Sequence, residues 1–136
     1  GGHRPIELPD PESQFHRLLG RWWIPWFQPQ HQHLIPLGRL KEELDGHGFD
    51  VVAEDRATAH QTVDLVIAAW LWLNHFVPTD SPWTPKGSPL RPVARLAVIA
   101  AGIPLLAAAF VGDQIANVFI QRSNRGNTFR VLARRR

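Results

Sequence analysis

Apolar and polar residues alternate in three short stretches, which is the period of a half-buried β-strand. The stretch HRPIEL ends at Pro9, because proline cannot continue the interior of a strand. FDVVAE is rich in β-forming residues, and TFRVLARR sends alternate side chains inward between its arginines. The pattern therefore predicts strands over residues 3–8, 49–54 and 128–135.

Apolar residues recur at helical spacing in two segments between the first two strands. Ser13 is a candidate N-cap for a helix over QFHRLLGRWW. LGRLKEELDGHG carries three leucines on one face, and Gly46 or Gly48 is placed to end that helix. A helix, a glycine turn and a strand in succession are the return half of a βαβ crossover, so this order predicts a parallel sheet.

Two proline-rich segments are predicted to lack regular structure. IPWFQPQHQHLIP carries three prolines and reads as an ordered, aromatic-rich loop. VPTDSPWTPKGSPLRP reads as a connector between two apolar helices. The first of these helices is predicted from about Ala57 to Phe76, and the second lies within VARLAVIAAGIPLLAAAFVGDQIANVFI.

The second apolar helix contains seventeen residues without charge, from Leu96 to Gly112. That length is at the bottom of the range for a membrane span, and Gly102 and Pro104 interrupt it, so spanning is not the default interpretation. The two helices could pack together as a cap. The alternative, which we favour, is association with a membrane surface, with the arginines at the lipid headgroups: Arg91, Arg95 and the cluster from Arg122 to Arg136.

The amino-acid composition limits the kinds of site and partner that the chain can have. The 136 residues include no cysteine, which excludes a disulfide framework, a thiolate metal site and a cysteine nucleophile. The net charge of +3 is small, and the basic residues gather at the end without interleaved exposed aromatics, so we expect no nucleic-acid binding. No signal-peptide pattern opens the chain. The absence of methionine leads us to expect a processed or partial chain.

Several stretches together resemble one known family. GGHRPIELPDPES, LLGRWW, QPQHQHLIPLGRLKEELDGHGFDVVAEDRA and GNTFRVLARR are similar, in their order and spacing, to the C-terminal half of a class I S-adenosylmethionine-dependent methyltransferase. The resemblance is greatest to members whose fifth strand follows a PGG turn and whose next loop carries a His-x-His segment. It covers residues 1 to about 56 and again the terminal strand.

The resemblance implies an α/β fold, the C-terminal portion of a Rossmann-like sheet. The three predicted strands would be strands five, six and seven, with the seventh antiparallel between the other two. Residues 1–56 and 128–136 would belong to this domain, and residues 57–127 would form an apolar helical insertion. The unpaired edge along HRPIEL would then be a liability for solubility.

The resemblance also implies methyl transfer from S-adenosylmethionine to a small-molecule or lipid-like acceptor. The glycine-rich cofactor motif of the family lies upstream of these strands, and no such motif occurs in this chain. We therefore expect the missing N-terminal half of the domain to bind the cofactor, and this chain to be inactive alone. The corresponding location is the cytoplasm, peripheral to the inner face of the membrane.

In open α/β sheets ligands bind beyond the carboxyl ends of the strands, so residues at those ends are candidates for chemistry. The first strand is followed by Pro9, Asp10 and Glu12, which we place at the substrate. Asp10 could act as a general base. Alternatively, PDPES is a turn in which Asp and Ser satisfy backbone N–H groups. The second strand is followed by the charged triplet Glu54, Asp55 and Arg56.

His31 and His33 would point to the same side of an extended segment. A metal site needs three or four ligands, and His60 or His75 would have to be recruited from far along the chain, so no metal is expected. A histidine in the substrate pocket has a pKa suited to proton transfer, which makes both candidates for catalysis. A structural role in packing the loop is the alternative.

An aromatic cluster completes the candidate acceptor site. The residues that could roof an apolar pocket are Trp22, Trp23, Trp26 and Phe27. The alternative is that they pack in the core. Trp70 and Trp72 cannot share one face of a helix, so one of them is expected to face lipid, substrate or a partner.

Two rival interpretations stay open. One is a non-catalytic, membrane-associated helical hairpin protein, which gives no reason for the strand-like segments at both ends of the chain. The other is a degenerate methyltransferase half that acts as the partner subunit of a separate cofactor-binding chain.

Overall fold

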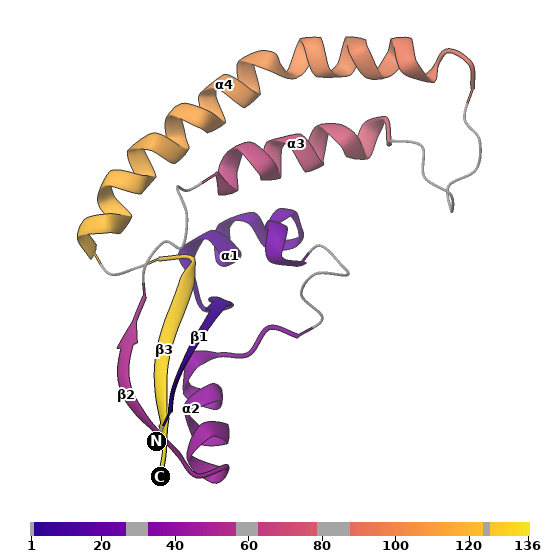
Figure 1. Cartoon of the computed structure of the whole chain (residues 1–136). Helices are drawn as coiled ribbons and strands as arrows, with labels where there is room; N and C mark the ends of the chain where they lie inside the picture. Colours follow the sequence, from indigo (N-terminus) through magenta and orange to yellow (C-terminus); the bar gives the residue numbers. More distant parts are fainter. Residues whose placement is uncertain (1, 27–32, 57–62, 79–87, 124–125) are drawn as a thin grey trace.

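The computed structural model describes residues 2–26, 33–56, 63–78, 88–123 and 126–136, with the backbone alone at 121–123. The fold is mixed α/β (Figure 1). A small sheet and one helix form one end, and the remaining helices gather beyond the other end of the sheet. The elements are β1 (His3–Pro9), α1 (Gln14–Leu19), the 3₁₀ turns η1 (Gly20–Trp22) and η2 (Ile24–Trp26), α2 (Leu37–Gly46), β2 (Phe49–Asp55), α3 (Asp64–Phe76), α4 (Arg91–Ser123) and β3 (Thr128–Arg135).

The three predicted strands form one sheet in the order β1-β3-β2. β3 is antiparallel to both neighbours, with Ile6 opposite Val131 on one side and Val51 opposite Ala133 on the other. This confirms that the terminal strand lies antiparallel between the other two. The prediction of a parallel sheet is wrong for the described pairings, because β3 separates the two strands that run in the same direction.

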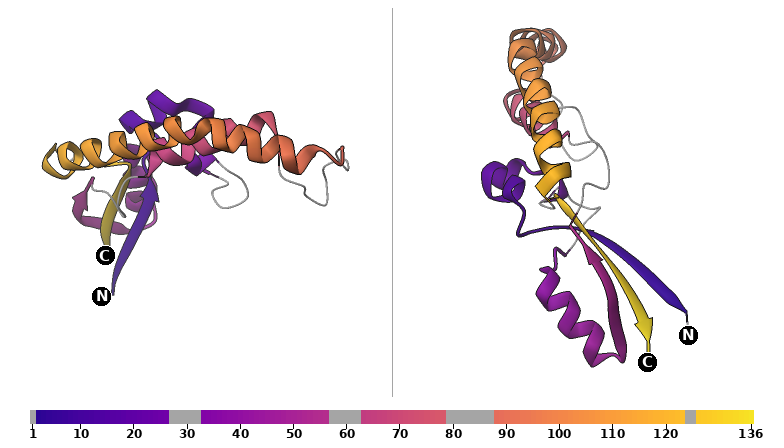
Figure 2. Two further views of the ribbon diagram at one scale, coloured as in Figure 1. Left: turned by 90° about the horizontal axis from the view of Figure 1, so that it is seen from above. Right: turned by 90° about the vertical axis from the view of Figure 1, so that its left-hand side faces the viewer.

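The core lies between the sheet and α2. Phe129 and Val131 of β3 are almost completely buried and pack with Leu37 of α2. Burial alternates along β3, so the predicted inward and outward faces of this strand are confirmed. Figure 2 shows α2 against one face of the sheet. The core therefore packs the last strand of the chain, β3, against α2, and Leu8 of the first strand packs against the same cluster.

The local signals at helix ends are mostly confirmed. Ser13 caps α1, and its hydroxyl accepts a hydrogen bond from the backbone N–H of His16. Gly48 follows α2 with a φ of 79°, a conformation that glycine adopts without strain. The helix predicted through Trp23 is wrong in its length, because Gly20 at φ 52° ends α1 and two 3₁₀ turns follow.

The two apolar helices form an antiparallel hairpin across the end of the sheet (Figures 1 and 2). α3 begins at Asp64, and residues 57–62 of its predicted range lie outside the described residues. α4 continues through Pro104, so neither this proline nor Gly102 interrupts it as expected. Gly102 faces α3 so closely that a Cβ there would lie 2.5 Å from Cδ1 of Leu73.

Candidate functional site

The candidate site lies where β1 and β2 end and β3 begins. Asp10 follows β1, Arg56 follows β2 and Asn127 precedes β3. The backbone N–H of Asp10 donates a hydrogen bond of 2.8 Å to the carbonyl of Asn127. The strands run slightly further than predicted, because Pro9 belongs to β1 and Glu54 and Asp55 belong to β2. Of the residues predicted beyond the two strands, Asp10, Glu12 and Arg56 are the ones that follow them.

Arg56 joins the two acidic residues that follow β1. Its Nε lies 3.1 Å from Oδ2 of Asp10, and its Nη2 lies 2.6 Å from Oε2 of Glu12. The Asp10 side chain is only 3% exposed, whereas Arg56 and Glu12 reach solvent. The buried carboxylate therefore has a cationic partner, as burial of a charge requires.

Asp10 also stabilises the turn in which it lies. Its Oδ1 accepts a hydrogen bond of 2.9 Å from the backbone N–H of Glu12. Together with the Ser13 cap, this is the arrangement of the turn interpretation of PDPES. Both Asp10 oxygens are engaged, so its role as a general base stays a prediction without support from these contacts.

A second carboxylate, Asp64 at the start of α3, connects three separate parts of the chain. Its Oδ1 accepts a hydrogen bond of 3.0 Å from the indole Nε1 of Trp23. Its Oδ2 accepts one of 2.6 Å from the amide Nδ2 of Asn127. Burial raises the pKa of Asp64, and the hydrogen bonds from Asn127 and Trp23 oppose that rise. Asp64 thus connects the hairpin to Trp23, which lies between η1 and η2, and to Asn127, which precedes β3.

A third carboxylate, Asp113, caps α3 from the neighbouring helix. It is completely buried, and its two oxygens accept hydrogen bonds from the backbone N–H groups of Leu65 (3.1 Å) and Val66 (3.0 Å). These groups belong to the first turn of α3, where N–H groups have no partner within the helix. The positive end of the helix dipole also favours a carboxylate there.

Sequence reasoning missed Asp64 and Asp113 as structural groups. The sequence carried a signal for buried carboxylates at these positions, because each is an acidic residue beside a long apolar segment. A buried carboxylate needs hydrogen-bond donors, and the first turn of a helix and an indole both provide them. Which donors would meet which carboxylate depends on the tertiary fold.

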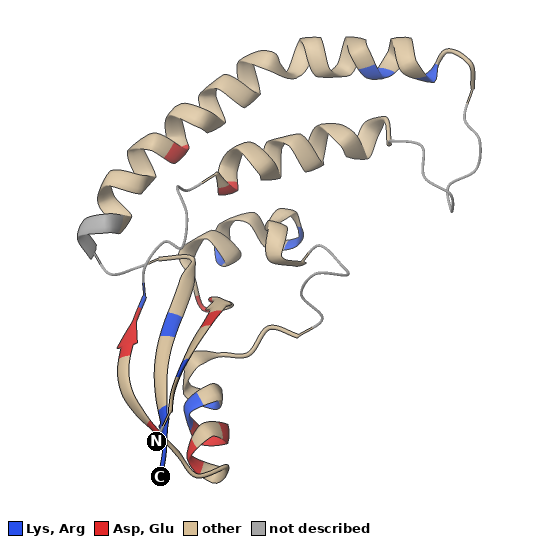
Figure 3. Cartoon of the chain, in the orientation of Figure 1, with Lys and Arg blue, Asp and Glu red and all other residues tan. Residues whose placement is uncertain are grey.

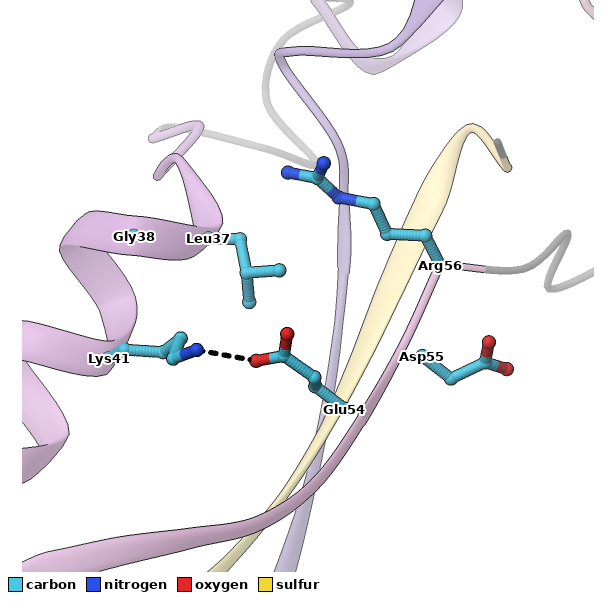
Figure 4. Close-up of a pocket in the computed structure, with 6 residues that line it drawn as sticks. All are labelled: Leu37, Gly38, Lys41, Glu54, Asp55 and Arg56. Carbon is cyan, nitrogen blue, oxygen red and sulfur yellow. Dashed lines mark hydrogen bonds and ion pairs between the residues drawn. The ribbon is translucent and has the colours of Figure 1, made fainter. Parts of the chain in front are cut away.

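A small polar hollow lies between α2 and the end of β2 (Figure 4). Its volume is about 250 Å³. Lys41 and Glu54 form an ion pair of 2.7 Å across it, and Asp55 points away from that pair. Leu37, Gly38 and Arg56 complete the lining. Lys41 and Glu54 thus neutralise each other across the hollow.

Two apolar cavities lie between α1 and the hairpin, with volumes of about 410 and 450 Å³. They share Leu18 and Leu65, so they adjoin, and we refer to the two together as the apolar groove. Trp22 and Trp72 line the larger cavity. This supports the expectation that part of the aromatic cluster borders an apolar pocket.

The structure separates the members of that cluster. Trp23 is completely buried and belongs to the Asp64 contacts rather than to a pocket roof. Trp26 is 45% exposed and packs its ring against His16. Phe27 lies outside the described residues. Trp70 lies under the guanidinium of Arg95, 5.7 Å from it, so Trp70 and Trp72 do face different surroundings.

Of the histidines considered from the sequence, the structure describes His33 and His75. His33 is exposed in the segment before α2, and His31 and His60 lie outside the described residues. His75 packs edge-on against Trp22 at the far end of α3. Within the described ranges no three His, Asp or Glu side chains are grouped as ligands of a metal.

The described residues do not fit S-adenosylmethionine. The turn after β1 carries prolines on both sides of Asp10, and Arg56 pairs with the Asp10 carboxylate. The adjacent hollow is small, and Lys41 and Glu54 pair across it. Comparison of the chain with protein-family models, with curated proteins and with solved structures found no match.

Proposed function

We propose that this chain is the substrate-side part of a class I S-adenosylmethionine-dependent methyltransferase domain. In this proposal the cofactor is held by strands that a further segment adds beside β1. The chain supplies the end of the sheet, the residues beyond its carboxyl edge and the helical hairpin. The enzyme would work in the cytoplasm, at the inner face of the membrane.

The observation that carries the proposal is the position of β3. β1 and β2 run in the same direction, linked by a segment that contains α2, and the last strand of the chain lies antiparallel between them. This is the arrangement that the family resemblance implies for strands five, six and seven. In the described sheet β1 is an edge strand, which leaves one side of its backbone available for further strands.

The apolar groove supports a lipid-like acceptor over a small polar one. Ligand pockets are mostly apolar with few polar groups, and the two cavities at α1 have this character. Trp22 borders the groove, and the aromatic residues beside it were the predicted acceptor site. Pro9, Asp10 and Glu12 stay proposed contacts at the reacting end of the acceptor.

The proposal is tested with the protein expressed from its complete gene. Radiolabelled S-adenosylmethionine is incubated with the protein and a lipid extract, and in parallel with a pool of small polar metabolites. Transfer of label to an organic-soluble product is expected. Absence of transfer to either pool, together with absence of cofactor binding, would contradict the proposal.

His33 is the proposed proton-transfer residue that is simplest to test, because it is exposed and its replacement does not disturb the core. His33→Gln is expected to lower turnover by about 10² to 10⁴, the usual contribution of a general acid or base. Gln32→Ala is the matched control in the same segment. Unchanged turnover in His33→Gln would assign His33 to packing.

One observation favours the second candidate, a non-catalytic membrane-associated hairpin protein. α4 is long and apolar enough to cross a membrane, yet only 6% of its most apolar stretch is buried. A hairpin protein of this kind, or a degenerate partner subunit, would bind membranes or a separate cofactor-binding chain without transferring methyl groups. The cofactor-binding measurement separates both from the enzyme.

A further inference from the structure

The apolar groove follows α1 and η1 along the hairpin. Its smaller cavity is lined by Gln14 at the start of α1, its larger cavity is lined by Trp22 at the end of η1, and Leu18 borders both. The hairpin forms the opposite wall, where Leu65 of α3 also borders both cavities. The groove is therefore elongated along one helix, a shape that suits a linear ligand.

Large apolar side chains of the groove wall are exposed to solvent. Leu18 is 73% exposed, and Trp72 of α3 and Phe119 of α4 are exposed as well. Each cavity has a volume within the range of about 300–1,000 Å³ that is usual for ligand pockets. Exposed apolar surface that lines a hollow is typical of a ligand-binding groove. We therefore asked which ligand the surrounding charges would favour.

Two exposed arginines, Arg17 and Arg21, lie beside the groove. The guanidinium of Arg21 lies over the ring of Trp22, 4.7 Å from the ring centroid, and Trp22 lines the larger cavity. Arg17 follows Gln14 by three residues, which places both on one side of α1, and Gln14 lines the smaller cavity. Figure 3 shows these two basic positions on α1 and η1, which contain no Asp or Glu.

No carboxylate of the described residues offsets these two charges. Neither Arg17 nor Arg21 forms an ion pair within the described part of the chain. The carboxylates of α3 and α4 are Asp64 and Asp113, and both are buried and engaged in hydrogen bonds. Glu12, which precedes α1, pairs with Arg56. The charge beside the groove is therefore positive, which is complementary to an anionic group on the ligand.

We propose that the apolar groove binds a single-chain anionic amphiphile, of the class of the long-chain fatty acids. The alkyl chain lies along α1 between Leu18 and Leu65, and Arg17 and Arg21 bind the carboxylate. A planar guanidinium can donate two parallel hydrogen bonds to a carboxylate. The inference rests on the proposed function in that it gives the lipid-like acceptor a chemical class, whereas binding itself requires no methyl transfer.

Equilibrium dialysis without S-adenosylmethionine tests the proposal. The protein from the complete gene is dialysed against radiolabelled tetradecanoate, and separately against tetradecan-1-ol, each at concentrations where the compound is monomeric. We expect tetradecanoate to bind about tenfold more tightly than the alcohol, because the carboxylate adds a charged hydrogen bond. The double variant Arg17→Gln, Arg21→Gln should remove this difference. The double variant Arg134→Gln, Arg135→Gln is the matched control, since it removes two exposed arginines from the end of β3 and should keep the difference.

Leu18→Glu tests where the alkyl chain binds. Leu18 borders both cavities, and because it is so exposed its replacement leaves the core unchanged. The variant should bind tetradecanoate and the alcohol about tenfold more weakly or worse, the effect of losing one buried apolar side chain from the contact. Leu90→Glu is the matched control, because Leu90 is 70% exposed and borders neither cavity. It should bind both compounds like the wild type.

Equal binding of the acid and the alcohol by the wild type, or binding of neither, would overturn the proposal. Equal losses in Leu18→Glu and Leu90→Glu would overturn it as well, because the ligand would then lie outside the groove. A dimer that Leu18→Glu dissociates, without tetradecanoate binding, would assign the groove to a second copy of this chain. Tetradecanoate binding without methyl transfer contradicts the proposed function alone, and methyl transfer without tetradecanoate binding contradicts the present proposal alone.

Discussion

The indole Nε1 of Trp23 donates a hydrogen bond of 3.0 Å to Oδ1 of Asp64, forty-one positions further along the chain. Both side chains are buried. Because Asn127 binds the other oxygen of Asp64, this carboxylate connects the turns after α1, the hairpin and the start of β3. The apolar hairpin is therefore held to the sheet by polar contacts as well as by packing.

Trp23→Phe removes the indole donor and leaves Oδ1 of Asp64 buried without it. We expect a loss of about 1–3 kcal/mol in the free energy of unfolding, the cost of an unsatisfied buried acceptor. Urea denaturation of the two proteins measures the difference. Trp26→Phe is the control, because Trp26 is 45% exposed and should change stability little. Equal losses for the two variants would contradict the role of the Trp23 hydrogen bond.

The raised pKa of Asp64 predicts a specific pH dependence of stability. Burial raises this pKa above the value near 3.9 of an aspartate in the unfolded chain. Between the two values the folded state binds more protons, so the contribution of Asp64 is complete below about pH 4 and is lost as pH rises through the folded pKa. Asp64→Asn should remove this decline.

The measurement is the free energy of unfolding of wild type and Asp64→Asn at a series of pH values. The wild type should lose stability relative to the variant as pH increases above about 4. Parallel profiles for the two proteins would show that Asp64 binds its proton equally in both states.

Asp113→Ala leaves two N–H groups at the start of α3 without their acceptor. The expected loss is about 0.5–2 kcal/mol, as for other helix N-caps. Asp113→Asn keeps one acceptor oxygen and should lose less. Thermal unfolding, monitored by circular dichroism, ranks the wild type and the two variants by stability. Equal stability of wild type and Asp113→Ala would show that water or other groups replace the carboxylate.

Gly102→Ala tests the close packing of the hairpin. Its Cβ would lie 2.5 Å from Cδ1 of Leu73, a buried side chain, so Leu73 must move. Gly38→Ala is the matched control in α2, where a Cβ meets nothing within 4 Å. The control should gain up to about 1 kcal/mol from helix propensity, and Gly102→Ala should lose stability. A similar gain in both variants would contradict the observed approach of α3 and α4.

Local patterns predicted much of the fold. The alternation in TFRVLARR identified the buried face of β3, and Ser13 and Gly48 marked real helix ends. The position of Gly20 before two tryptophans did not reveal that α1 stops there, because apolar spacing continued past it. Whether a glycine continues or ends a helix depends on tertiary contacts as much as on sequence.

The candidate site was predictable only in part. Asp10 and Arg56 could be placed at one edge from the strand ends alone. The pairing of Arg56 with both Asp10 and Glu12 required the strand order, since β1 and β2 are not neighbours in the sheet. Trp23 and Asp64 are far apart in sequence, and no local pattern indicates a hydrogen bond between them.

The proposed methyltransferase sheet requires further strands beyond β1. In an edge strand only alternate backbone N–H groups bond to the neighbouring strand. Hydrogen exchange of the β1 amides, measured by NMR in the protein from its complete gene, tests this directly. We predict slow exchange at consecutive residues, Ile6, Glu7 and Leu8, because strands lie on both sides of β1. Alternating fast and slow exchange along these three residues would show that β1 is an edge and would contradict the proposed methyltransferase sheet.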